Sequence, residues 1–180
     1  MFGAFAPTDL DTDYKPGIDA LTVDAYPSAF STLTGTYVLG PRDEDDIENS
    51  SAIHYRRQVG VLSELSLLAA SVIGNRVVGA AFESAWEGMG WRVEGAHYTL
   101  EQTDENAFFW IAGIDYMLDD GTLLAAEWYD NSRGAASEDE LATGMTDPLV
   151  VYRLQQHLGR QILGLSLSRD LTPLLNGGYT

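Results

Sequence analysis

The feature that most constrains this chain is a pair of aromatic and branched stretches joined by an Asp-Gly turn. Residues 107–118 and 122–131 flank the tripeptide Asp119-Asp120-Gly121. An Asp-Gly step between two such runs strongly indicates a β-hairpin, because the tight turn needs a backbone that Asp and Gly adopt readily. The sequence therefore predicts two antiparallel strands here.

The two faces of this hairpin differ in chemistry. Side chains of a strand alternate between faces, so one face collects apolar and aromatic groups, namely Phe108, Trp110, Ile114, Tyr116 and Trp128. The other face mixes small and apolar residues with Asp115, Glu127 and Tyr129. In a soluble sheet the apolar face forms the core, whereas in a transmembrane barrel it faces lipid and the mixed face lines the lumen.

The same alternation recurs along the chain. It predicts further strands at residues 18–26, 30–39, 52–59, 63–72, 77–86, 91–100 and 160–169, with another beginning near the end. Short connections alternate with longer ones, although the link near Gly74 is short where a long one is expected. This alternation is typical of outer-membrane barrels. We expect an N-terminal arm or loop over residues 1–16 and one all-β domain over residues 17–180, an antiparallel up-and-down transmembrane β-barrel with about nine or ten strands present.

Composition narrows the function classes. A formal charge of −17 argues against a nucleic-acid partner, because phosphates would be repelled. The chain has no cysteine, which excludes disulfides and thiolate metal sites. No unbroken apolar run reaches about 18 residues, so no transmembrane helix is expected. The first residues lack the basic and apolar regions of a signal peptide, so the chain is either cytosolic or missing its front end.

Three stretches carry a family resemblance. They are Trp91–Ala96, the Asp119–Gly121 hairpin and Leu163–Ser168. In spacing and overall pattern they resemble Gram-negative outer-membrane β-barrel proteins of the porin-like kind, over about residues 17–175. The resemblance implies location in the cell outer membrane, transport, membrane lipid and small solutes or ions as partners, and no cofactor. The family also implies an export signal and an aromatic last residue, and this chain has neither, so we expect an internal piece of a larger barrel.

Strand alternation assigns candidate residues to each face. The predicted lumen-lining set is Asp24, Arg56, Glu64, Glu83, Arg92, Glu94, Asp115, Glu127, Tyr129 and Arg160. The predicted lipid-facing or girdle set is Trp86, Trp91, Phe108, Trp110, Ile114, Tyr116, Trp128, Leu163, Leu165 and Leu167. Acids outnumber arginines in the lumen set, which favours cations, although such charges can also simply solvate a lumen or form a structural ladder.

Other chemistry finds little support in the sequence. His54, His97 and His157 lack metal-ligand spacing, and residues 43–46 lack the glycine of an EF-hand loop. Ser66, Ser166 and Ser168 lie in no Gly-x-Ser-x-Gly elbow. We therefore expect no enzyme activity and no metal site.

Two functions follow from the two interpretations of the sheet. The leading hypothesis is a passive pore or scaffold for small hydrophilic solutes, with the long connection Ser132 to Gln156 a candidate for folding inward as a constriction. A barrel closed at about eight to ten strands would be filled by its side chains, which favours a structural or adhesion role. The alternative is a soluble, lipocalin-like barrel that binds an apolar ligand, with Phe108, Trp110, Ile114, Trp128 and Leu165 pointing inward.

Overall fold

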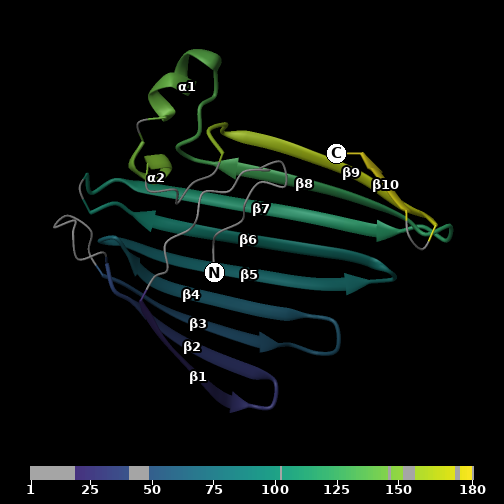
Figure 1. Cartoon of the computed structure of the whole chain (residues 1–180), viewed down its shortest axis with the longest axis horizontal. Helices are drawn as coiled ribbons and strands as arrows, with labels where there is room; N and C mark the ends of the chain where they lie inside the picture. Colours follow the sequence, from purple (N-terminus) through teal and green to yellow (C-terminus); the bar gives the residue numbers. More distant parts are fainter. Residues whose placement is uncertain are drawn as a thin grey trace.

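The architecture is a single antiparallel sheet (Figure 1). The computed structural model describes residues 19–40, 49–101, 103–145, 147–151, 157–172 and 175–179. Its 10 strands follow one another in chain order, which confirms the predicted all-β, up-and-down topology. They are β1 (Ala20–Ser28), β2 (Ser31–Val38), β3 (Ser50–Gln58), β4 (Glu64–Val72), β5 (Asn75–Trp86), β6 (Met89–Thr99), β7 (Asn106–Met117), β8 (Thr122–Asn131), β9 (Gln161–Thr172) and β10 (Leu175–Tyr179).

The sheet is open. Across the described residues β1 pairs with β2 and β10 pairs with β9, and no pairing joins β1 to β10. Within the part of the chain that the structure describes, β1 and β10 are therefore the two edge strands. The predicted arm over residues 1–16 and most of the acidic connection after β2 lie outside the described residues.

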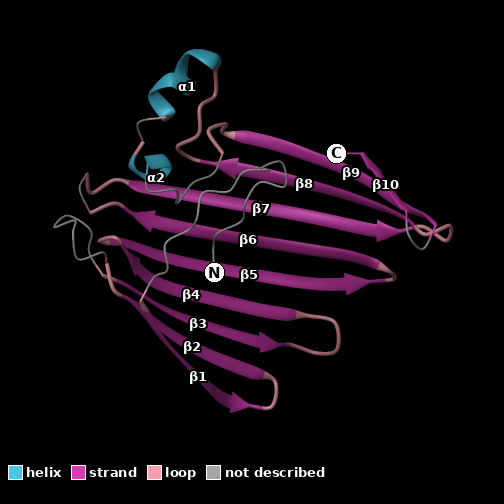
Figure 2. Ribbon diagram, in the orientation of Figure 1, coloured by secondary structure: helices cyan, strands magenta, loops and turns pink. Residues whose placement is uncertain are grey.

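Connection lengths follow the predicted alternation at all but one place. At one end the connections are residues 29–30, 59–63, 87–88, 118–121 and 173–174. At the other end they are residues 39–49, 73–74, 100–105 and 132–160. The link at residues 73–74 is the exception, because it is short although it lies at the end with long connections. Figure 2 shows that one end of the sheet has tight turns and the other carries the helical connection. We call them the turn end and the loop end.

Several predicted turns are tighter than expected. Pairing of Trp86 with Met89 leaves only Glu87-Gly88 as the turn, with φ of 50° and 82°. Two successive positive φ angles form a turn whose twist matches the strands, so pairing continues into residues that the sequence assigned to the turn. Pro27 and Ser28 were likewise assigned to a turn but belong to β1, where a register shift between Ala25 and Ser28 accommodates the proline.

Two short helices lie inside the longest connection. They are α1 (Glu138–Gly144) and α2 (Pro148–Val151), and Figure 2 places both beside the loop end of the sheet. The residues directly after Asp147 form α2. Leu149 N donates to Asp147 Oδ1 at 2.9 Å, so Asp147 caps the turn that Pro148 opens. Among the described helices, none is long and apolar enough to cross a membrane.

The strand register separates the side chains into the two expected faces. We call the first the apolar face; it carries Trp86, Trp91, Phe108, Trp110, Ile114, Tyr116, Trp128, Leu163, Leu165 and Leu167 and continues through Leu67, Ile53, Leu33 and Val23. The mixed face carries Asp24, Arg56, Glu64, Glu83, Arg92, Glu94, Asp115, Glu127 and Tyr129. Arg160 was assigned to a strand, but β9 begins at Gln161, so Arg160 belongs to the preceding connection.

Burial is concentrated away from the apolar face. On that face Trp86, Ile114 and Leu165 are 66%, 52% and 63% exposed. The buried hydrophobic cluster instead joins Leu149 of α2 to Leu100 and Ala107, with Tyr98 and Phe109 packed against it. Because a sheet in water normally hides its apolar side chains, this distribution is the main structural anomaly to be explained.

Candidate functional site

Charged side chains of the mixed face gather in two neighbouring rows. Strand pairing aligns Glu64, Glu83, Arg92, Gly113 and Glu127 across β4 to β8. The next row toward the loop end contains Arg56, Glu94 and Tyr129. The register thus brings together seven of the predicted lumen-lining residues: Arg56, Glu64, Glu83, Arg92, Glu94, Glu127 and Tyr129.

The remaining predicted residues of this face lie apart from these rows. Asp24 is on the outer strand β1, where Thr34 Oγ1 donates to its Oδ1 at 2.6 Å. Asp115 lies nearer the turn end, with its carboxylate over Gly90, where an added Cβ would stand 2.7 Å from Oδ1. Arg160 lies in the connection before β9, where its backbone N donates to Ala135 O at 2.9 Å.

Two ion pairs lie within the charged rows. Arg56 Nε is 3.5 Å from Glu64 Oε1, and Arg92 Nη2 forms an ion pair with Glu127 Oε1. The side chains of Arg92 and Glu127 are 48% and 41% exposed, so solvent screens the attraction and each such pair is worth at most about 1 kcal/mol. Across the described part of the chain, no ion pair reaches Glu83 or Glu94. The rows therefore retain excess negative charge.

The long connection between β8 and β9 packs onto this same face. Leu149 is fully buried in a cluster with Leu100 and Ala107, and Tyr98 and Phe109 of the mixed face pack against that cluster. Further along the connection, the His157 ring meets the Tyr129 ring edge-on with centroids 5.4 Å apart. Among the described residues of the connection, Leu149 and His157 therefore lie against the mixed face.

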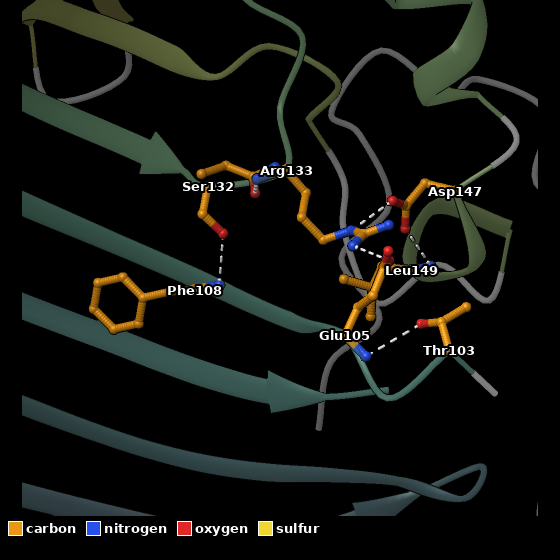
Figure 3. Close-up of polar contacts among 8 residues, drawn as sticks. Thr103, Glu105, Phe108, Ser132, Arg133, Asp147 and Leu149 are labelled. Atoms are coloured by element: carbon orange, nitrogen blue, oxygen red, sulfur yellow. Dashed lines mark hydrogen bonds and ion pairs between the residues drawn. The ribbon is translucent and has the colours of Figure 1, made fainter. Parts of the chain in front are cut away.

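An arginine holds the connection in place (Figure 3). Arg133 Nη1 is 2.7 Å from Glu105 Oε2 in the β6–β7 connection, and Arg133 Nε is 2.7 Å from Asp147 Oδ2 before α2. Burial acts to lower the pKa of Arg133, but hydrogen bonds to both carboxylates and their charge outweigh it and raise the pKa above its usual value. The guanidinium therefore stays charged and links two connections and the end of β8. Sequence reasoning missed it, because no local pattern joins these three residues.

Two buried asparagines organise the backbone at the loop end. Asn75 Oδ1 accepts from Glu101 N at 3.2 Å, while its Nδ2 donates to Val72 O and Ile73 O. Asn131 Oδ1 accepts from Arg133 N at 2.9 Å. These bonds hold adjacent connections against the strand ends, and the bond from Asn131 fixes the backbone of Arg133.

The candidates for other chemistry are dispersed. His54 lies on the mixed face of β3, and His97 lies on the apolar face between Val78 and Phe108. Within the described ranges, no group of three His, Cys, Asp or Glu residues could hold a metal ion.

The candidate site is therefore the charged mixed face of the sheet, which the β8–β9 connection, held by Arg133, partly covers at the loop end. No family model, no curated protein and no solved structure matches this chain.

Proposed function

We propose that this sheet is part of the wall of a transmembrane β-barrel in the outer membrane of a Gram-negative cell. The apolar face contacts lipid, and the mixed face lines a passive pore for small hydrophilic solutes. The observation that carries this proposal is the contrast between an exposed apolar face and a charged face with its own covering connection. A bilayer supplies the apolar surroundings that the exposed face otherwise lacks.

Strand length supports the membrane assignment. Strands β5, β7 and β9 have 12 residues each, and a tilted strand needs about 9–11 residues to cross the hydrocarbon core. Trp86 and Tyr116 lie near the turn end of the apolar face, whereas Phe108 and Trp110 lie toward the loop end. This is the placement expected for two interfacial aromatic girdles.

Charges on the apolar face also fit a lipid-exposed band. Arg57 is the next-to-last residue of β3, Arg76 the second of β5 and Asp130 the next-to-last of β8. Their positions place the charges at the two rims, where headgroups and water can solvate them. The middle of the face, around Ile114 and Trp128, consists of apolar side chains.

The free edges set a further condition on this proposal. Unpaired backbone groups in hydrocarbon cost several kcal/mol each, so β1 and β10 are paired when the sheet is in the membrane. Closure with only these strands gives a bore filled by side chains, whereas a conducting pore needs additional strands between the two edges. The pore proposal therefore includes a barrel wider than the ten strands seen here.

The connection over the mixed face supports a restricted bore. Leu149 of α2 and the ring contact of His157 with Tyr129 bring part of the connection against the mixed face, which in this proposal is the inner wall. Free carboxylates in the two charged rows would favour cations among the solutes that pass. In the soluble alternative, Ile114 and Leu165 would line a closed interior, and their 52% and 63% exposure supports the membrane proposal instead.

Reconstitution tests this function directly. The protein is purified in detergent as a closed barrel, in which further strands or further copies of the chain pair with β1 and β10. It is then inserted into planar bilayers and measured for stepwise conductance across a KCl gradient. We expect discrete conducting steps with K⁺ more permeant than Cl⁻. A protein that is monodisperse in buffer without detergent and produces no conductance would contradict the pore and favour the soluble alternative.

A further inference from the structure

We propose that Gly113 sets both the width and the charge of the passage at its charged row. It does so by letting Arg92 lie flat against the wall, and the solutes admitted there are small cations. This inference rests on the proposed pore function, because it assumes that the mixed face lines the bore.

Arg92 does not form its ion pair with the carboxylate of the directly opposite residue. Glu83 stands directly opposite Arg92 on the adjacent strand β5, yet the guanidinium bonds Glu127 on β8. Strand β7 lies between these partners, so the two side chains together span two strand spacings of about 4.8 Å each. The residue of β7 that faces both Arg92 and Glu127 is Gly113.

Glycine is what leaves this path open. A Cβ at position 113 would stand 3.3 Å from Arg92 Nε and 3.4 Å from its Cγ and Cζ. All three nearest atoms belong to Arg92, so the arginine side chain itself covers the glycine. Gly113 is accordingly buried although most of the strand around it is half-exposed. A larger side chain here would take the space that the guanidinium occupies.

The position of Arg92 determines what a solute meets. Held against β7, the guanidinium adds little to the bulk in the bore, and Glu127 neutralises its charge. Glu83 and Glu94, on β5 and β6, then face the passage without an arginine partner among the described residues. If Arg92 were lifted off the wall, its guanidinium would project into the bore. Its positive charge would offset the charge of Glu83 and Glu94 and hinder the passage of cations.

The test is a Gly113→Val variant, since valine suits a strand and fills the space under the guanidinium. The matched control is Gly164→Val in the same row, where an added Cβ meets only ordinary contacts, Glu127 Cβ at 3.9 Å and Glu127 O at 4.0 Å. The rescue is the double variant Gly113→Val/Arg92→Ala, which removes the side chain that valine displaces. Each is measured in planar bilayers for single-channel conductance and for reversal potential in a KCl gradient.

We expect Gly113→Val to lower conductance about twofold and to bring the K⁺/Cl⁻ permeability ratio toward one, because a charge moves into the bore. The control stays near wild type, and the double variant recovers conductance.

The role of Gly113 is refuted, and the pore proposal is kept, if the wild-type pore conducts and Gly113→Val has the same conductance and permeability ratio. The same holds if the double variant does not recover conductance. If the valine variant does not fold, Gly113→Ala and Arg92→Gln replace it; unchanged permeability ratios in both would equally refute the proposal. A wild-type closed barrel that does not conduct removes the pore and this inference together.

Discussion

The two faces of the sheet arise from the same strands but have different surroundings. The apolar face has large side chains such as Trp86 and Leu165 more than half exposed. The mixed face carries ion pairs and the buried residue Leu149 from the connection that covers it. In a protein folded in water the chain would be expected to cover the apolar face first. The reverse arrangement is what the proposed membrane location would explain, because lipid rather than water would then surround the apolar face.

The largest effect should come from placing a charge on the apolar face. Ile114→Arg near the middle of that face should destabilise the barrel in lipid vesicles by about 2–4 kcal/mol, because the guanidinium enters hydrocarbon. Ile111→Arg is the matched control on the same strand; it lies on the mixed face opposite Glu94 and Tyr129. That change should cost less than about 1 kcal/mol, since water and a carboxylate are within reach.

Urea-dependent unfolding in vesicles, followed by tryptophan fluorescence, measures both variants. Equal costs for the two substitutions would erase the distinction between the faces. A larger cost at Ile111 would reverse it and favour the soluble alternative, in which the apolar face is the interior.

The second effect concerns the cover of the mixed face. Leu149→Ala should weaken docking of the connection by about 2 kcal/mol, because it truncates a fully buried leucine of the cluster with Leu100 and Ala107. We expect faster proteolysis within residues 132–160 and a higher single-channel conductance. Leu163→Ala on the apolar face, 58% exposed, is the control and should change neither measurement. Unaltered conductance with a cleaved connection would show that the connection is no constriction.

How far the sequence predicts the fold depends on the range of each interaction. Alternation assigned the residues of both faces, because every side chain follows a period of two along its own strand. The Glu87-Gly88 turn was misjudged, since Met89 and Gly90 look like turn residues and only the pairing of Met89 with Trp86 shows otherwise. Local pattern thus predicts which face a residue occupies better than it predicts where a strand ends.

The candidate site was less accessible to sequence reasoning. That Arg92 lies on the same face as Glu83 and Glu127 follows from alternation, but its choice between the two carboxylates depends on the register across three strand pairs. The contacts of Arg133 with Glu105 and Asp147 join residues far apart in the chain. Such contacts depend on the path of a connection that has no repeating pattern.

A third, smaller effect compares arginines at the two ends of the sheet. Arg133→Gln should loosen the connection by about 1 kcal/mol, because Arg133 is partly buried and bonds two carboxylates. Arg169 at the turn end pairs with Asp120 at 3.1 Å, and both side chains are about half exposed. Arg169→Gln should therefore have almost no effect. Hydrogen exchange of residues 132–160 distinguishes the two; equal protection in both variants would rule out Arg133 as the residue that holds the connection.

The smallest effect is a gain in stability that leaves both faces unchanged. Ile73 and Gly74 form the β4–β5 turn with φ of 50° and 76°, and a β-branched residue is strained at such an angle. Its backbone bonds, from Ile73 N to Ser50 Oγ and from Asn75 Nδ2 to Ile73 O, are independent of the side chain. Ile73→Asn should therefore stabilise the sheet by about 1 kcal/mol, as Asn-Gly suits this turn.

The equivalent change at the turn end, Glu87→Asn, calibrates that gain. Glu87 has φ of 50° but is not β-branched, so relief of strain should be worth less than about 0.5 kcal/mol. The midpoint of urea unfolding in vesicles measures both, and conductance should remain at the wild-type value because neither residue lies on a strand face. A changed conductance in Ile73→Asn would mean that the turn at residues 73–74 affects the pore. The properties of the pore would then depend on more than the difference between the two faces of the sheet.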